Sequence, residues 1–172
     1  MSNNSELAGS VRPYFARSIP RSAGDADENK EQSGGESLGA AKGLILETIR
    51  ANAWPVNVDG DVFVIRVSLG LDRKQAVSVD FTRKDEFGRP LIVYSSPCGP
   101  ATERNALALL RRNRRMYQTA FATEKHNGVE RILLRGFQRL DGLSPTTVTK
   151  MIQHLAQQAD TIELKLLGTD TL

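Results

Sequence analysis

The segment 129–167 constrains the fold more than any other part of this 172-residue chain. Residues 129–137 favour a strand, and a turn containing Asp141-Gly142 follows it. The pair Ser144-Pro145 is typical of a helix start, because serine caps the helix and proline lacks only an N–H that has no partner there. Apolar residues then recur every three or four positions on one stripe, which a sheet or another helix must cover because an isolated helix gains little stability by itself. The stripe contains Val148, Met151, Ile152, Leu155, Ala156, Ala159, Ile162 and Leu166.

Before this segment the chain alternates helix and strand patterns. Ser37 can cap a helix that runs to about Ala53, and Thr102, or Gly99 followed by Pro100, can start a shorter one. Alternation of apolar and polar residues is typical of strands in an antiparallel sheet, and a break at 95–100 closes the third of them. The predicted strands are 62–69, 77–82, 91–94, 116–122 and 129–137. The order helix, three strands, helix, two strands, helix predicts an α+β fold, with about five antiparallel strands and the helices on one face, rather than a doubly wound parallel sheet.

Residues 1–37 are predicted to be a disordered tail, and residues 38–172 a single α+β domain. The stretch 22–35 contains no large apolar residue, so it cannot bury enough surface to offset the entropy of ordering. The apolar cluster at 11–19 is consistent either with incidental hydrophobic residues or with a short docking segment. No apolar run reaches the roughly 18 residues of a membrane span, and the N-terminus lacks a signal-peptide pattern, so we expect a cytoplasmic protein without membrane contact.

Positive charge is concentrated in one part of the chain. The net charge is +3, but residues 101–139 carry nine basic side chains against three acidic ones. The densest patch consists of Arg111, Arg112, Arg114 and Arg115. Guanidinium groups match phosphate geometry, so this patch is our candidate for an anionic partner, and the alternative is a solvated helix end whose charges suit the helix dipole. No zinc-finger spacing, helix-turn-helix signature or ribonucleoprotein box accompanies it, although Tyr117 and Phe121 lie nearby.

Cysteine and histidine residues are too few to predict a catalytic or metal site. Cys98 is the single cysteine, so no intrachain disulfide forms, and with His126 and His154 it provides too few ligands for structural zinc. A Cys98 nucleophile would need a histidine base within hydrogen-bond reach and a third group to orient it. Acidic neighbours such as Asp85 and Glu86 fall in turns, where they are expected for backbone reasons. We therefore predict no catalytic residue, cofactor or metal.

Three local sequences carry a resemblance to a known family. They are 107–113 (Leu-Ala-Leu-Leu-Arg-Arg-Asn), the strand pair around Phe121 and Leu133, and 140–145 (Leu-Asp-Gly-Leu-Ser-Pro). With the order of elements, they resemble the bacterial YbjN-like family, which shares the fold of type III secretion chaperones. The resemblance spans about 38–167. It implies a small non-enzymatic protein, often dimeric, that holds or regulates another protein through a sheet or groove surface.

Our principal prediction is a non-enzymatic protein-binding module of chaperone or regulatory type that presents a sheet or groove surface to a protein partner. A homodimer is one arrangement that this prediction allows. The alternative is a protein that binds nucleic acid or an acidic partner through the patch from Arg111 to Arg115, and its affinity should then fall steeply with salt. A small enzyme is the third hypothesis, and it requires convergent polar groups in a pocket.

Overall fold

The computed structural model describes residues 30–70 and 72–168, and the tail before residue 30, with its apolar cluster at 11–19, lies outside them. Within the described residues the chain forms three helices and six strands. In chain order they are α1 Lys30–Ala51, β1 Val56–Asp59, β2 Val62–Gly70, β3 Arg73–Lys84, β4 Pro90–Pro100, α2 Glu103–Asn113, β5 Thr119–His126, β6 Val129–Arg139 and α3 Pro145–Gly168. The predicted order is confirmed, with one additional strand, β1.

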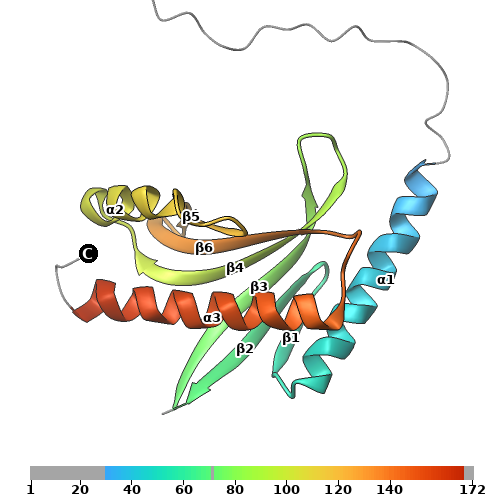
Figure 1. The fold of residues 1–172 in the computed structure, drawn as a ribbon, viewed down its shortest axis with the longest axis horizontal. Helices are drawn as coiled ribbons and strands as arrows, with labels where there is room; N and C mark the ends of the chain where they lie inside the picture. Colours follow the sequence, from blue (N-terminus) through green and yellow to red (C-terminus); the bar gives the residue numbers. More distant parts are fainter. Residues whose placement is uncertain (1–29, 71, 169–172) are drawn as a thin grey trace, which may run out of the picture.

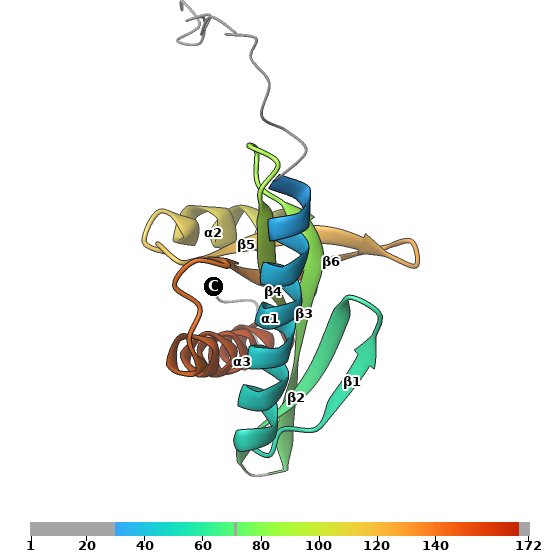
Figure 2. The ribbon, with the colours of Figure 1, turned by 90° about the vertical axis from the view of Figure 1, so that its right-hand side faces the viewer.

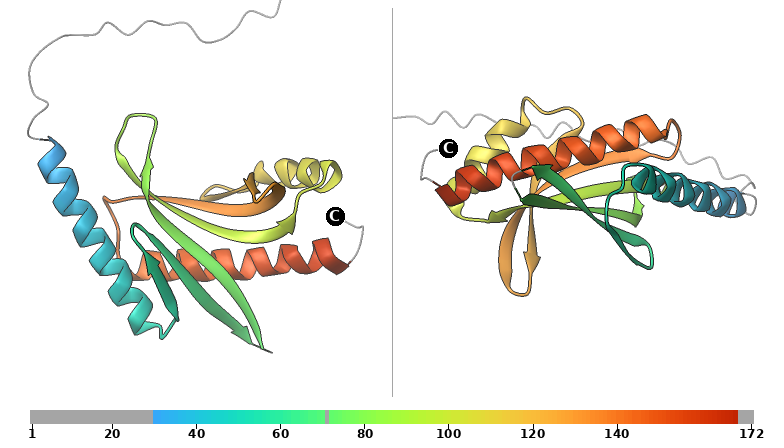
Figure 3. Two further views of the ribbon diagram at one scale, coloured as in Figure 1. Left: turned by 180° about the vertical axis from the view of Figure 1, so that it is seen from behind. Right: turned by 90° about the horizontal axis from the view of Figure 1, so that it is seen from below.

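The six strands form one antiparallel sheet in the order β1-β2-β3-β4-β6-β5 (Figure 1). The three helices lie on the same side of this sheet (Figure 2), and α3 contacts β2, β3, β4 and β6. The tips of the β1–β2 and β5–β6 hairpins project away from the helices (Figures 2 and 3), so the opposite face of the sheet is concave. The predicted α+β class with helices on one face is confirmed.

The apolar stripe of α3 forms the centre of the core, as predicted. Its fully buried members are Val148, Ile152, Leu155, Ala156, Ala159 and Ile162. They share one core cluster with inward-facing strand residues such as Ile92, Tyr94 and Leu134. Gly136 on β6 permits the close approach of α3, because a Cβ at this position would lie 2.6 Å from the sulfur of Met151. The helix is therefore held tightly across the sheet.

The break predicted at 95–100 is wrong, because β4 continues through it. At this point side chains replace the backbone ladder between β3 and β4. Gln75 on β3 donates its side-chain N–H to the Pro97 carbonyl (2.6 Å), and Ser96 Oγ donates to the Ala76 carbonyl (2.8 Å). A register shift on the β6 side accommodates the proline, which has no N–H for a ladder. The prediction ended the strand too early because it treated the serine and proline residues of this stretch as strand breakers.

Three other boundaries differ from prediction. The helix α1 begins at Lys30, so Ser37 lies inside it rather than capping it. The sequence pattern does not predict β1, because four residues are too few to establish an alternation. The strand β5 begins later than predicted, at Thr119, and it extends to a two-residue hairpin turn in which Asn127 and Gly128 have positive φ angles of 49° and 81°.

Candidate functional site

Polar side chains hold both ends of α2 in place. At the N-terminal end Thr102 Oγ1 accepts the Asn105 N–H (3.2 Å), and the Asn105 side chain accepts the Thr102 N–H (2.7 Å), so the predicted start at Thr102 is confirmed. At the other end Asn113 donates to the Phe121 carbonyl (3.0 Å) and accepts the Phe121 N–H (2.8 Å). Since β5 is an edge strand, Asn113 occupies backbone groups that would otherwise be free. The end of α2 is thereby attached to β5, with Leu109 buried beneath the helix.

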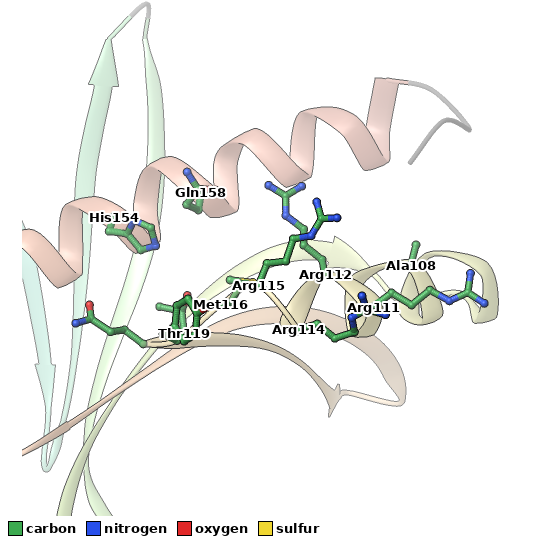
Figure 4. Close-up of a pocket in the computed structure, with 11 residues that line it drawn as sticks. Ala108, Arg111, Arg112, Arg114, Arg115, Met116, Thr119, His154 and Gln158 are labelled. Carbon is green, nitrogen blue, oxygen red and sulfur yellow. The ribbon is translucent and has the colours of Figure 1, made fainter.

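A cleft of about 1160 Å³ lies between the end of α2, the residues that follow it and α3 (Figure 4), and we call it the arginine cleft. Its lining consists of Ala108, Arg111, Arg112, Arg114, Arg115, Met116, Tyr117, Gln118, Thr119, His154 and Gln158. Arg112 and Arg115 point across the cleft toward α3 (Figure 4). The four arginines of the predicted patch therefore line a single cavity.

The positive charge of the arginine cleft is not balanced by nearby acidic side chains. None of its four arginines forms an ion pair within residues 30–70 and 72–168, and none of the described lining residues is acidic. Four like charges within five positions repel one another, and the negative end of the α2 dipole offsets only part of that repulsion. An anion can therefore bind here without first breaking an internal ion pair.

Two lining residues come from α3 and were not assigned to this patch by sequence analysis. His154, considered in the sequence only as a metal ligand or a base, lies across the cleft from the arginines together with Gln158 (Figure 4). Their four-residue spacing places both on one side of α3. The sequence contains no signal for their approach to α2, because the two helices come together only by packing side by side on the same face of the sheet.

A second hollow, of about 540 Å³, lies on the concave face of the sheet, and we call it the open-face hollow. Its apolar lining residues are Val62, Leu91, Val93, Pro97, Leu133 and Phe137. Val93 is only 8% exposed, whereas Phe137 is 48% exposed, so accessible apolar surface lies beside a shielded floor. The uncovered face of an antiparallel sheet is commonly polar. This apolar floor is therefore unusual for a surface that meets only water.

The charged side chains of the open-face hollow include two ion pairs. Arg83 donates to Asp80 (2.8 Å), and Arg135 donates to Glu124 (2.9 Å). Burial opposes the ionisation of Asp80, but hydrogen bonds from Thr82 and Arg83 outweigh that cost and lower its pKa. These four charges are matched within the molecule, whereas Lys84 and Arg131 also line the hollow and form no ion pair among the described residues. The hollow therefore combines an apolar floor with a small excess of positive charge.

The structure separates the residues that were considered for nucleophilic catalysis. Cys98 is fully buried, and burial raises the pKa of its thiol to about 12. His126 lines the open-face hollow and His154 lines the arginine cleft, so neither shares a cavity with Cys98. A thiol that stays neutral and buried does not act as a nucleophile. The structure therefore does not bring together the groups that catalysis by Cys98 would need.

Acidic residues of the β3–β4 turn have a structural role, as predicted. Asp85 accepts the backbone N–H groups of Phe87 and Arg89, each at 2.9 Å. A hydrogen bond from the Arg89 side chain lowers the pKa of Asp85. Among the residues that the structure describes, no three His, Cys, Asp or Glu side chains gather in a way that could hold a metal ion. None of the described helices is both long and apolar enough to cross a membrane.

The sequence matches no protein-family model and no curated protein. Chains of several solved structures share its fold, among them the following three. The type III secretion chaperone SycH of Yersinia pestis, solved with a stable fragment of YscM2, matches with 16% identity and a TM-score of 0.50 over 71% of this chain and 98% of that chain. A chain of the HopA1–SchA chaperone–effector complex matches with 13% identity and a TM-score of 0.54, over 75% and 96%. YbjN from E. coli, described as a candidate transcription regulator, matches with 8% identity and a TM-score of 0.53, over 72% and 89%.

These matches define the class of fold. The chain has the α+β fold of type III secretion chaperones, which YbjN also has, as the resemblance of its local sequences implied. At identities of 8–16% the likeness establishes the fold alone. Any inference about function must therefore rest on the chemistry of the arginine cleft and of the open-face hollow.

Proposed function

We propose that this protein is a non-enzymatic protein-binding module of chaperone or regulatory type, which holds a segment of a partner protein in the open-face hollow. The observation that carries the proposal is the apolar floor of the hollow, on the face of the sheet opposite the helices (Figure 2). Removing apolar surface from water is favourable by roughly 25 cal/mol per Å². An apolar centre bordered by charged side chains is also the usual anatomy of a protein interface.

The face of the sheet is better suited to a partner than its edges. The edge strand β1 has only four residues, which limits the ladder that an added strand could form. At the other edge, Asn113 already bonds both backbone groups of Phe121. We therefore expect the partner to bind through side chains that fill the hollow.

Two of the structural neighbours support this class of function. SycH was solved with a fragment of YscM2, and the HopA1–SchA structure is a chaperone–effector complex. Since a fold does not specify a function, the proposal depends on the open-face hollow and not on the likeness. We expect the protein to bind its partner in the cytoplasm. A second copy of this chain is the alternative occupant, and it would form a two-fold symmetric dimer.

The substitution Phe137→Asp tests the proposal, with Phe87→Asp as the matched control. Both rings are exposed, by 48% and 72%, but only Phe137 lines the hollow, whereas Phe87 lies in the β3–β4 turn under the Arg89 guanidinium. We expect the full-length protein to capture a partner from a lysate of its own cells at high salt. The Phe137→Asp variant should lose this partner and the Phe87→Asp variant should retain it. Mass spectrometry identifies the partner, and calorimetry with the purified partner measures the affinity.

Equal capture by all three proteins would overturn the proposal, provided that circular dichroism shows the variants to be folded. Light scattering on the purified protein distinguishes the two occupants. A homodimer that only Phe137→Asp dissociates would identify the second copy as the occupant of the hollow.

A further inference from the structure

The arginine cleft and the open-face hollow are independent sites. The cleft lies between α2 and α3, on the helical side of the sheet, and it shares no lining residue with the hollow. Its four guanidinium groups have no ion-pair partner among the described residues. Concentrated charge of one sign in a concave surface raises the local concentration of ligands of the opposite sign. The cleft is therefore built for an anionic ligand, which the proposed protein-binding function does not require.

The neighbouring residues indicate what kind of anion this is. Tyr117 lines the cleft but is 97% exposed, so its ring is free to stack on a flat partner. Gln118, Thr119 and Gln158 add hydrogen-bonding groups along the same lining. Arginines that bind phosphates, combined with an exposed aromatic ring that stacks on a base, are the usual elements of a single-strand binding site. An acidic peptide would use the arginines but would have no specific need for the exposed ring.

The direction of Arg112 and Arg115 favours a single strand over a duplex. Arg112 and Arg115 point across the cleft toward α3 (Figure 4), whereas the base-reading side chains of a recognition helix point outward into a groove of the duplex. A flexible single strand can follow a cleft between two helices. We propose that the arginine cleft binds single-stranded nucleic acid, with phosphates at Arg111, Arg112, Arg114 and Arg115 and a base stacked on Tyr117.

The salt dependence of binding tests the arginine contacts. We would titrate the full-length protein into a fluorescein-labelled oligo(dT) of roughly 16 nucleotides and follow its anisotropy at several salt concentrations. Each phosphate neutralised on a single strand contributes about −0.7 to the slope of log affinity against log salt, so four contacts predict a slope of about −3. The double variant Arg112→Ala/Arg115→Ala should reduce the slope to about half. The control Arg50→Ala/Arg66→Ala removes the same charge from exposed positions outside the cleft and should leave the slope unchanged.

The Tyr117→Ala variant tests the choice of nucleic acid over acidic protein. Loss of one stacked base should weaken binding by about tenfold without changing the salt slope, since the ring carries no charge. Polyglutamate should compete only weakly with the oligonucleotide. The proposal is overturned if no binding occurs at low salt, or if the control double variant loses as much affinity as the cleft variant. If polyglutamate competes equally and Tyr117→Ala has no effect, the ligand is an acidic protein segment instead.

Discussion

The arginine cleft and the open-face hollow balance their charges to different degrees. In the hollow, Arg83 and Arg135 are each matched by a carboxylate of the same chain, only Lys84 and Arg131 lack an ion pair among the described residues, and the floor between the charges is apolar. In the cleft, four arginines have no such partner within the described part of the chain. Where charges are paired within the protein, binding depends mainly on apolar contact. Where they are unpaired, binding depends mainly on electrostatic attraction. The two surfaces of one small domain should therefore respond differently to salt and to substitution.

The substitution with the largest expected effect destabilises α3, the helix on whose packing both surfaces depend. Leu155→Ala deletes a fully buried side chain at the centre of the α3 stripe and should lower the free energy of unfolding by about 2–5 kcal/mol. Chemical denaturation measures this loss. Leu164→Ala is the matched control on the same helix, because Leu164 is 51% exposed and its truncation should cost no more than about 0.5 kcal/mol. Equal losses for the two variants would show that the stripe does not anchor α3.

Salt should separate the two surfaces. Between about 50 and 200 mM salt, binding of the oligonucleotide to the arginine cleft should weaken by about 50-fold, as a slope near −3 requires. Capture of a protein by the open-face hollow should weaken much less, because only Lys84 and Arg131 among its charged lining residues lack an ion pair within the described part of the chain. Anisotropy and calorimetry under matched conditions give both values. A similar salt response at both surfaces would remove the distinction between them.

A smaller effect comes from the attachment of α2 to the sheet. Asn113→Ala removes both hydrogen bonds to the Phe121 backbone and should lower the free energy of unfolding by about 1–3 kcal/mol. The variant should also weaken oligonucleotide binding although no charge changes, because the end of α2 positions the arginines. Hydrogen exchange at the Phe121 amide should become faster. Unchanged exchange at this amide would mean that Asn113 does not hold the edge strand.

The smallest expected effect concerns pH and the open-face hollow. Since the pKa of Asp80 is lowered in the folded protein, its ionised form is favoured by folding. This contribution is present above the unfolded value of 3.8 and is lost as the pH falls through the lower folded value. Denaturation between pH 6 and about pH 3 should show Asp80→Asn to be less acid-sensitive than the unsubstituted protein. An identical acid response of the two proteins would argue against the Asp80–Arg83 pair.

Regular local patterns predicted most of the fold correctly. The α3 stripe, the start of α2 at Thr102 and the hairpin before Val129 depend on residues close together in sequence, and the structure confirms each of them. The strand β4 shows where such rules fail. Its continuation through Pro97 depends on the side chain of Gln75, which lies more than twenty positions away in the chain.

The candidate sites divide in the same way. The charge of the patch from Arg111 to Arg115 is visible in the sequence, because the four residues lie within five positions. That the patch lines a cavity with His154 and Gln158 is not visible, since α3 reaches it only through packing on the sheet. The apolar floor of the open-face hollow draws on β2, β4 and β6, so no local pattern indicates it.

By itself, the sequence determined the order of the elements, the buried face of α3 and the place of the charged patch, because each depends on spacing along one segment. Only the tertiary structure decided that Cys98 is buried in the core, that Arg112 and Arg115 point toward α3 and that an apolar floor remains open on the sheet. The physical reason is that burial and charge pairing depend on every segment that surrounds a side chain. Those segments meet only when the chain has folded.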